Sequence, residues 1–239
     1  MPKNRHFNRT IALTALVFSQ ICVTEGADSP TPLTDPLGDL SLEQLLNVKV
    51  TSVARREEAL SDSPAAIYVV TQDAIRRSGA TSIPEALRLV PGMNVAQVDA
   101  HNWAISARGF NDVFANKLLV LIDGRTVYTP LFSGVFWDNQ DVMMADVDRI
   151  EVIRGPGASL WGANAVNGVT NDITKRASQT QGLYGSVGGG TEKRAFGEIR
   201  FGGMLGENIY YRVWGKAMSH DDSRLLGTRS EAHDAWETA

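Results

Sequence analysis

Cysteine is almost missing from this sequence of 239 residues, in which Cys22 is the only one. One cysteine cannot form an intrachain disulfide, and it gives no thiolate pair for a metal. No apolar run after residue 27 approaches the roughly 18 residues of a membrane-spanning helix. An excess of positive charge is also missing, because 23 Lys and Arg stand against 27 Asp and Glu, a net charge of −4. This balance argues against nucleic acid as a partner.

The sequence also lacks the residue patterns of common catalytic and nucleotide-binding sites. His101, His220 and His233 lie far apart in polar segments, and no H-E-x-x-H pair is present. The glycines of residues 155–162 do not have the G-x-G-x-x-G spacing, and Pro156 removes a backbone N–H that an anion would need. The sequence therefore predicts no enzymatic activity, no catalytic residue, no cofactor and no metal site.

The first 27 residues have the plan of a secretory signal peptide. Basic residues within Met1–Arg9 precede the mostly apolar run Ile11–Val23, which at about 13 residues is short for a membrane span. Cys22 lies in this run, and its flanking residues do not fit a lipoprotein cleavage box. Removal of residues 1–27 leaves 20 basic and 26 acidic residues, a net charge of −6. A secreted, cysteine-free chain of this composition fits the envelope of a Gram-negative bacterium.

Residues 146–175 are the most informative part of the chain. Asp148–Arg154 alternates apolar with charged side chains, which predicts a strand with one face covered. Gly155-Pro156-Gly157 ends that strand, and a second extended run begins after Asn167-Gly168 and ends at Lys175.

Several motifs in this order resemble the plug domain of TonB-dependent outer-membrane receptors. They are ISARGF at 105–110, LVLIDGR at 119–125, IRGP at 153–156 and WGANAVNGV at 161–169. The resemblance covers residues 40–219. It implies import of a ferric siderophore, cobalamin or a similar scarce solute across the outer membrane. The energy-coupling protein TonB and the lipid of the outer membrane are the partners that it implies.

The expected fold of this part is an α+β plug domain, a small mixed β-sheet with short helices. Lys117–Ile122 is apolar at every position after its first residue, which predicts a central strand covered on both faces, and Asp123-Gly124 predicts a hairpin after it. Thr71 as cap and Gly79 as stop predict the first helix, and Ser82 as cap and Pro91-Gly92 as stop predict the second. The other expected elements are strands at Ala66–Val70, Met93–Val98 and Trp103–Arg108 and helices at Gln72–Arg77 and Ser82–Val90.

The pattern changes from residue 178 onward. Runs at 181–190, 195–202 and 209–218 alternate small or apolar side chains with polar or aromatic ones, as transmembrane β-barrel strands do. A soluble sandwich would give a similar alternation. With the resemblance, these runs are expected to be the first three antiparallel strands of a truncated transmembrane β-barrel. A barrel needs at least ~8 strands to close, and the polar tail His220–Ala239 is expected to be an outer loop.

These observations predict four parts: a signal peptide at 1–27, a linker with a TonB-box-like strand at 28–63, a plug domain at 64–177 and an incomplete barrel start at 178–239. The alternative to a receptor fragment is a stand-alone periplasmic module that binds or interacts without transport.

The predicted linker contains an alternating extended hexamer whose position resembles that of the TonB box. A strand without an internal partner has free backbone groups and can pair with the sheet edge of another protein. The alternative is an edge strand of the chain's own fold. The hexamer consists of Val48, Lys49, Val50, Thr51, Ser52 and Val53.

Arg108 and Arg154, which are each followed by glycine, match arginines of the family that bind glutamates of the barrel wall. The resemblance therefore implies a plug–barrel contact. The alternative is a pair of solvated strand ends.

Four aromatic side chains are candidates for ligand contact, and a local hydrophobic cluster is the alternative. They are Trp103, Phe132, Phe136 and Trp137.

One position departs from the family pattern. Thr170 and Asp172 lie where relatives have aliphatic residues. Because burial of a lone carboxylate is costly, Asp172 is expected to face water or to have a partner.

Overall fold

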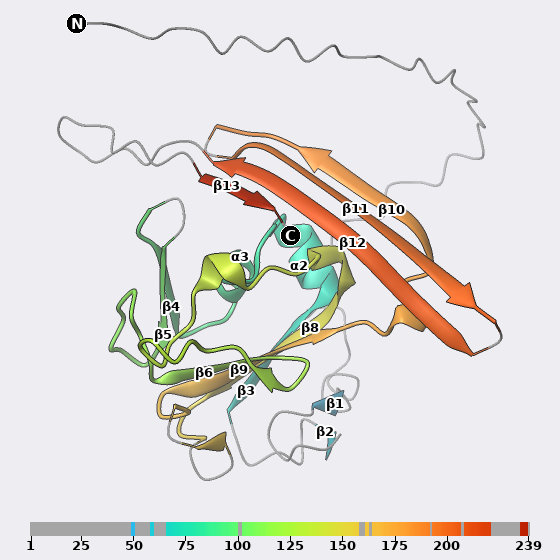
Figure 1. Ribbon diagram of the computed structural model, residues 1–239. Coiled ribbons are helices and arrows are strands. Elements are labelled where there is room, and N and C mark those ends of the chain that lie inside the picture. The colour runs from blue at the N-terminus through green and yellow to red at the C-terminus, as the bar shows by residue number, and fades with distance from the viewer. Residues whose placement is uncertain are drawn as a thin grey trace, which may run out of the picture. The chain divides into compact units, whose positions relative to one another are not determined.

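A five-stranded mixed sheet lies at the centre of the computed structural model, which describes residues 49–50, 58–59, 66–99, 102–157, 161–162, 164–191, 193–206, 208–220 and 235–238 (Figure 1). The strand order is β3-β8-β9-β6-β7. β9 pairs antiparallel with β8 and parallel with β6, so the mixed sheet is confirmed. The strands are β3 (Ile67–Thr71), β6 (Leu118–Ile122), β7 (Arg125–Thr126), β8 (Val147–Arg154) and β9 (Gly168–Thr174).

The helix α2 (Gln72–Ser78) begins and ends where its capping residues predict. The Thr71 hydroxyl accepts a hydrogen bond from the Ala74 N–H at 3.3 Å, which satisfies one of the free donors of the first turn. Gly79 follows with φ 71°, the left-handed conformation that glycine adopts at little cost.

The helix α3 (Ile83–Leu87) is shorter than the predicted Ser82–Val90. Ser82 makes no side-chain cap, and the Glu85 carboxylate instead accepts a hydrogen bond from the Thr81 N–H at 2.7 Å. After Leu87 the backbone N–H groups bond three residues back, so the helix closes in tight turns before Pro91.

The remaining elements of this part are two hairpins and three short 3₁₀ helices. β4 (Met93–Gln97) pairs antiparallel with β5 (Trp103–Ala107), as predicted. Asp123 and Gly124 join β6 to β7 with φ values of 50° and 77°, the two positive values of a type I′ turn. The 3₁₀ helices are η2 (Trp137–Asn139), η3 (Met144–Asp146) and η4 (Ala177–Gln179).

The sheet is covered on both faces. Successive side chains of β6 point to opposite faces, so Leu118 and Val120 join the larger core cluster while Leu119 and Leu121 join the smaller one. The larger cluster also holds Ile150 and the buried residues of α2 and α3. The prediction of a strand that is covered on both faces is therefore confirmed.

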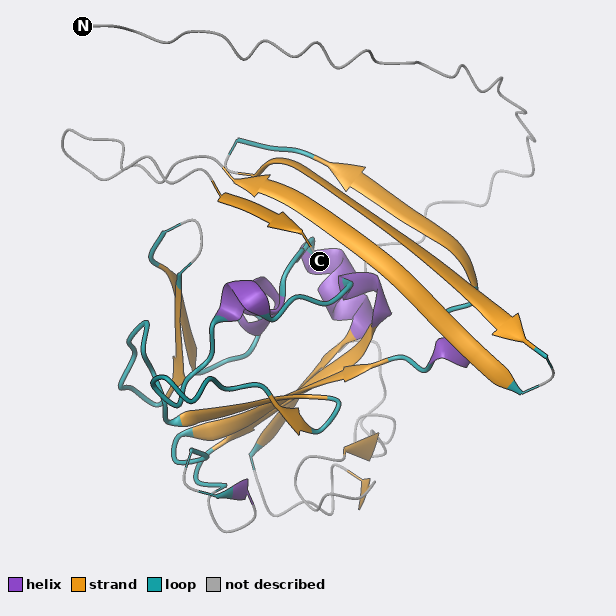
Figure 2. Ribbon diagram, viewed as in Figure 1, coloured by secondary structure: helices purple, strands orange, loops and turns teal. Residues whose placement is uncertain are grey.

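Four antiparallel strands after residue 180 form a second sheet, which we call the ribbon (Figure 2). Within the described part of the chain, neither core cluster contains a ribbon residue. The ribbon is thus a separate layer and not an extension of the central sheet. Its strands are β10 (Gly182–Gly188), β11 (Lys193–Leu205), β12 (Ile209–His220) and β13 (Ala235–Thr238).

The prediction that His220–Ala239 is only an outer loop was wrong for its last residues. Ala235–Thr238 pairs antiparallel with Ala217–His220 of β12 and gives the sheet a fourth strand. A β12 edge would otherwise present unpaired N–H and C=O groups, which pairing with even a short strand satisfies. Over the ranges given above, the structure contains no helix of the length and hydrophobicity needed to span a membrane.

Candidate plug–ribbon contact and ligand surface

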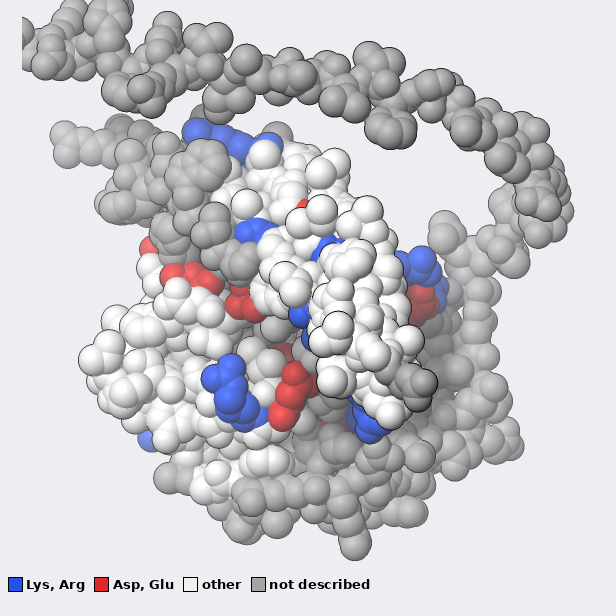
Figure 3. Space-filling view, turned by 45° about the vertical axis from the view of Figure 1, so that its right-hand side comes forward, with Lys and Arg blue, Asp and Glu red and all other residues white. Residues whose placement is uncertain are grey.

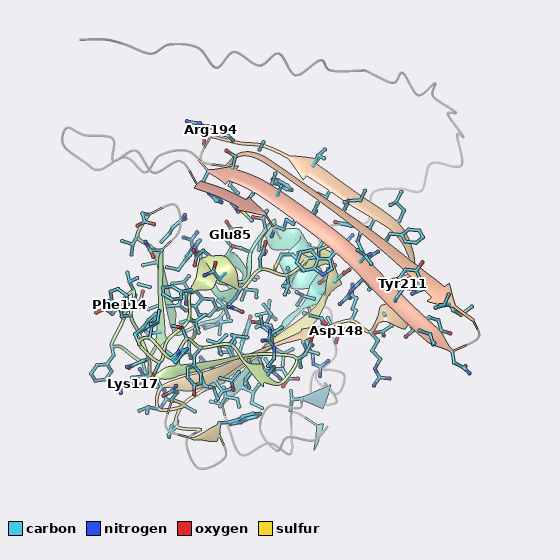
Figure 4. The ribbon with its side chains drawn as sticks, in the orientation of Figure 1. Glu85, Phe114, Lys117, Asp148, Arg194 and Tyr211 are labelled. Atoms are coloured by element: carbon cyan, nitrogen blue, oxygen red, sulfur yellow. The ribbon has the colours of Figure 1, made fainter. Side chains whose placement is uncertain are left out.

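The contact between the first part of the chain (residues 66–175) and the ribbon is ionic. From α3, Glu85 reaches Lys193 of β11, with 2.5 Å between carboxylate oxygen and Nζ (Figure 4). Asp141 and Lys216 of β12 are 2.7 Å apart, and their side chains are only 7% and 1% exposed. The Lys216 ammonium also donates to the Thr81 carbonyl at 2.8 Å. Removal of either the carboxylate or the ammonium would leave the other as an uncompensated buried charge, which is strongly destabilising.

A third acidic residue, Asp146, pairs with two ribbon arginines. It is 2% exposed and accepts a hydrogen bond from Nη1 of Arg200. Nη1 of Arg212 lies 3.4 Å from its other carboxylate oxygen and donates to the Lys175 carbonyl at 3.0 Å. The ribbon thus meets three carboxylates of the preceding domain with four basic side chains, an arrangement that we call the plug–ribbon contact.

Strand periodicity explains how the ribbon can make this contact. Arg200, Arg212 and Lys216 lie on the same face of β11 and β12, because Gly202 pairs with Arg212 and Glu198 pairs with Lys216. The side chains of the opposite face are apolar and exposed, and that face forms a broad uncharged area in Figure 3. They include Leu183, Val187, Ile199, Phe201, Leu205, Ile209 and Val213.

The ion pairs also perturb the titration of Glu85. Burial, the largest single influence, would raise the pKa of this carboxyl, but the hydrogen bonds from Lys193 and Thr81 together with the Lys193 charge outweigh it, and the pKa of Glu85 is lowered. The pair therefore stabilises the contact at neutral pH, and this contribution is lost as the pH falls through the lowered pKa.

A cavity of about 460 Å³ lies between α2 and the inward face of the ribbon. Its lining mixes basic Arg76 and Lys175 with Tyr184, Glu198 and Arg200. A second cavity of about 30 Å³ between α3 and the ribbon is lined by residues that include Glu85, Asp141 and Lys193, which is room for one water molecule. The interface is therefore polar and incompletely packed.

The structure brings Arg108 and Arg154 to the carboxyl end of β8, an interior strand of the central sheet. The Arg154 guanidinium donates to the Pro91 carbonyl at 2.9 Å. Arg108 has φ 57° and lies over Gly155, where an added Cβ would be 3.6 Å from Nη1. Among the described residues, the ion pairs with the ribbon involve acidic side chains of the preceding domain and not these arginines.

The four aromatic candidates separate into two groups. Trp103 and Trp137 are 9% and 8% exposed and belong to the larger core cluster, which agrees with the alternative of a local hydrophobic cluster. Phe132 packs edge-to-face against Phe136 at 5.1 Å and against Phe114 at 5.2 Å between ring centroids.

Sequence analysis missed most of the exposed apolar surface around these rings. Phe114 is 61% exposed (Figure 4), Phe110 is 79% exposed and Leu131 is 81% exposed. The sequence signal was available, because Phe110 and Phe114 follow Arg108-Gly109 in a segment without strand or helix periodicity. Phe114, Phe132 and Phe136, which pack ring against ring, form what we call the aromatic surface.

The hexamer 48–53 is described only at Lys49–Val50, which form β1, and the rest lies outside the described residues. β1 pairs antiparallel with β2 (Glu58–Ala59), and Val50 is completely buried. The expectation of a strand without an internal partner was therefore wrong for these two residues. The pairing satisfies backbone groups that an unpaired strand would leave to water.

The expectation for Asp172 was also wrong. Its side chain is completely buried, and neither carboxylate oxygen has a hydrogen-bond partner within the described residues. Burial raises the pKa of Asp172 to about 8, and the neighbouring Asp123 carboxylate adds to the rise. Protonation thus takes the place of a partner, because a neutral carboxyl is much less costly to bury than a carboxylate.

Comparisons with known proteins agree with this architecture. Residues 59–169 match the TonB-dependent Receptor Plug Domain family. The chain is 31% identical over 145 residues to the vitamin B12 transporter BtuB of Vibrio vulnificus, covering 60% of this chain and 23% of that protein. It is 30% identical over 193 residues to the ferric enterobactin receptor of Pseudomonas aeruginosa, covering 72% and 25%.

Solved structures give the same fold. The pyoverdine outer membrane receptor FpvA of Pseudomonas aeruginosa PAO1 aligns with a TM-score of 0.59 at 23% identity, covering 81% of this chain and 28% of that one. The siderophore receptor PiuA of Acinetobacter baumannii aligns with a TM-score of 0.57 at 25% identity, covering 76% and 24%.

The mixed sheet and these matches define residues 59–169 as a plug domain of the TonB-dependent receptor family. Of these relatives, FpvA is by its name an outer membrane receptor. The chain spans about a quarter of the length of the curated relatives that it matches.

Proposed function

We propose that this chain is the amino-terminal part of a TonB-dependent receptor that imports a scarce solute, a ferric siderophore or a cobalamin-like compound, across the outer membrane. The observation that carries the proposal is a plug that contacts a separate ribbon through buried ion pairs. The relatives are by name transporters and receptors, which supports transport and not catalysis as the activity of this chain.

In this proposal the ribbon is the beginning of the transmembrane β-barrel. One of its faces is apolar and exposed, which suits lipid, and the other carries the charged side chains that contact the plug. The domain boundary then lies near residue 178, where the chain leaves η4 and enters β10.

Uptake of labelled solute by whole cells tests the proposal. Cells that express the receptor gene are supplied with labelled ferric enterobactin, ferric pyoverdine or cobalamin, with and without TonB. Uptake of one of these that disappears without TonB supports a receptor. If the chain stays in the soluble periplasmic fraction and none of these solutes is taken up, the receptor proposal is wrong and the stand-alone periplasmic module is favoured.

Energy coupling in this proposal runs through residues 48–53, the TonB-box-like hexamer. Proline lacks a backbone N–H and cannot complete a strand pairing. We therefore expect Val50→Pro to lower TonB-dependent uptake at least about tenfold, while surface binding of the same solute stays unchanged. Equal loss of binding and uptake would instead show that the substitution disrupts the plug.

The aromatic surface is the proposed place of ligand contact. Phe132 lies at its centre, between Phe114 and Phe136. We expect Phe132→Ala to weaken binding of the imported solute about tenfold, the typical cost of losing a central aromatic contact. Trp137→Phe, in the core, is the matched control, because it should lower stability and leave affinity unchanged.

A further inference from the structure

Asp172 is the least expected side chain of the plug. It lies on β9, the middle strand of the central sheet, with Ile150 of β8 on one side and Ile122 of β6 on the other. Thr170 precedes it on the same face, and the Thr170 hydroxyl is also buried without a hydrogen-bond partner within the described residues. A carboxyl group and a hydroxyl group thus interrupt a core face that is otherwise mostly aliphatic.

No basic group among the described residues is placed to neutralise this carboxyl. On β8, Arg149 and Glu151 alternate with Ile150, so they lie on the opposite face of the sheet, where they pair with each other at 2.9 Å. On β6, the charged neighbour is Asp123, which follows Ile122 and has the same sign.

Two helices pack on this side of the sheet, and neither supplies a counter-charge. The charged residue of α3 is Glu85, which is acidic and pairs with Lys193. The buried residue of α2 is Ile75, and its charged residues Asp73, Arg76 and Arg77 pair with one another at the surface. On the edge strand β7, Arg125 is exposed. The folded sheet therefore holds Asp172 in its neutral form by excluding water and counter-charge.

We propose that Asp172 is a proton-controlled weak point of the plug: β9 lies between β8 and β6 only while this carboxyl keeps its proton, and exposure of β9 releases the proton to water. The carboxylate that remains cannot be buried again without taking a proton back. The plug is therefore held together less tightly at neutral pH than at mildly acidic pH. Its use during solute passage rests on the proposed function, whereas the pH dependence of unfolding does not.

The sign of the effect follows from the direction of the shift. The pKa of Asp172 is raised from 3.8 in the exposed state to about 8 in the folded state. The folding equilibrium is therefore most favourable below about pH 4 and weakens about tenfold for each pH unit until about pH 8. Between pH 5 and pH 8 the expected total weakening is of the order of several hundredfold.

Urea unfolding of the 239-residue chain in detergent micelles, followed by tryptophan fluorescence at pH 5, 6.5 and 8, tests this proposal. The unfolding midpoint of the native chain should fall as the pH rises. Asp172→Asn keeps the shape without the charge, and its midpoint should be almost independent of pH over the same range. Asp148→Asn, which changes a partly exposed carboxylate of the same sheet, should keep the slope of the native chain.

Two results would overturn the proposal. One is a native chain whose midpoint does not change with pH, and the other is an Asp172→Asn variant that keeps the native slope. If Asp172→Asn fails to fold, Asp172→Val replaces it, since valine suits a strand between Ile122 and Ile150. Difference infrared spectroscopy adds an independent readout, in which the carbonyl band of a protonated carboxylic acid at pH 7 should disappear with Asp172→Asn.

Discussion

Asp141→Ala is expected to destabilise the chain by about 3–5 kcal/mol, the usual cost of removing one partner of a buried ion pair. The substitution leaves the Lys216 ammonium in a site where its side chain is 1% exposed. One hydrogen bond, to the Thr81 carbonyl, remains, but it supplies no negative charge. Urea unfolding of the variant beside the native chain measures the difference in the free energy of unfolding.

A surface ion pair provides the control for this prediction. Asp73 pairs with Arg76 and Arg77 on α2, where its side chain is 43% exposed, so Asp73→Ala should cost much less stability than Asp141→Ala. The double variant Asp141→Leu with Lys216→Met should recover most of the lost stability, because apolar residues can replace a buried pair. Equal, small effects of the Asp141 and Asp73 variants would show that the plug–ribbon contact is not buried in solution.

Val213→Arg is expected to have a similarly large effect for a different reason. Val213 lies in the middle of β12 on the apolar outward face and is 65% exposed. In a barrel, an arginine at the middle of the lipid-facing surface costs about 2–4 kcal/mol. We expect the variant to unfold from lipid vesicles at correspondingly lower denaturant concentration, or to insert poorly.

Ala217→Arg is the matched control on the same strand and the same face. Ala217 lies near the end of β12, where the cost of an outward arginine falls to about 0–1 kcal/mol. A soluble sheet would tolerate both arginines equally well. If Val213→Arg leaves both insertion and stability in lipid vesicles unchanged, the assignment of this face to lipid is contradicted.

Local patterns in the sequence were sufficient for most of the fold. The cap residues Thr71 and Gly79 predicted both ends of α2, and Asp123-Gly124 predicted the hairpin between β6 and β7. The period-two alternation of residues 195–218 predicted the two faces of the ribbon. These features depend on neighbouring residues, which a single sequence displays directly.

The contacts that hold the parts together could not be predicted in this way. Asp146 and Arg200 are separated by 54 positions, and Thr81 and Lys216 by 135. From sequence alone, an isolated charged residue in a strand or loop is predicted to be exposed to solvent, because its partner is distant in the sequence. The family resemblance indicated two arginines, Arg108 and Arg154, as contact residues, whereas the residues that contact the ribbon are acidic.

Burial was the other limit of sequence reasoning. Trp103 and Trp137 are of a residue type that is common on recognition surfaces, but both lie in the core. Phe110 and Phe114, in contrast, are exposed. For Asp172, the chemical cost of burial predicted water or a partner, but the structure buries the carboxyl without a hydrogen-bond partner among the described residues, and burial raises its pKa to about 8. In each case, three-dimensional packing decides whether a side chain reaches solvent.

The central claim is that the ribbon has one face for lipid and one for the plug. Spin labels at single cysteines along β11 and β12, in a chain with Cys22 replaced by serine and reconstituted in lipid vesicles, test it most directly. Labels at Ile199, Phe201 and Val213 should be accessible to oxygen dissolved in lipid but not to a water-soluble nickel chelate, and labels at Arg200 and Trp214 should not share this pattern. Equal access of the nickel chelate to both sets would contradict the account.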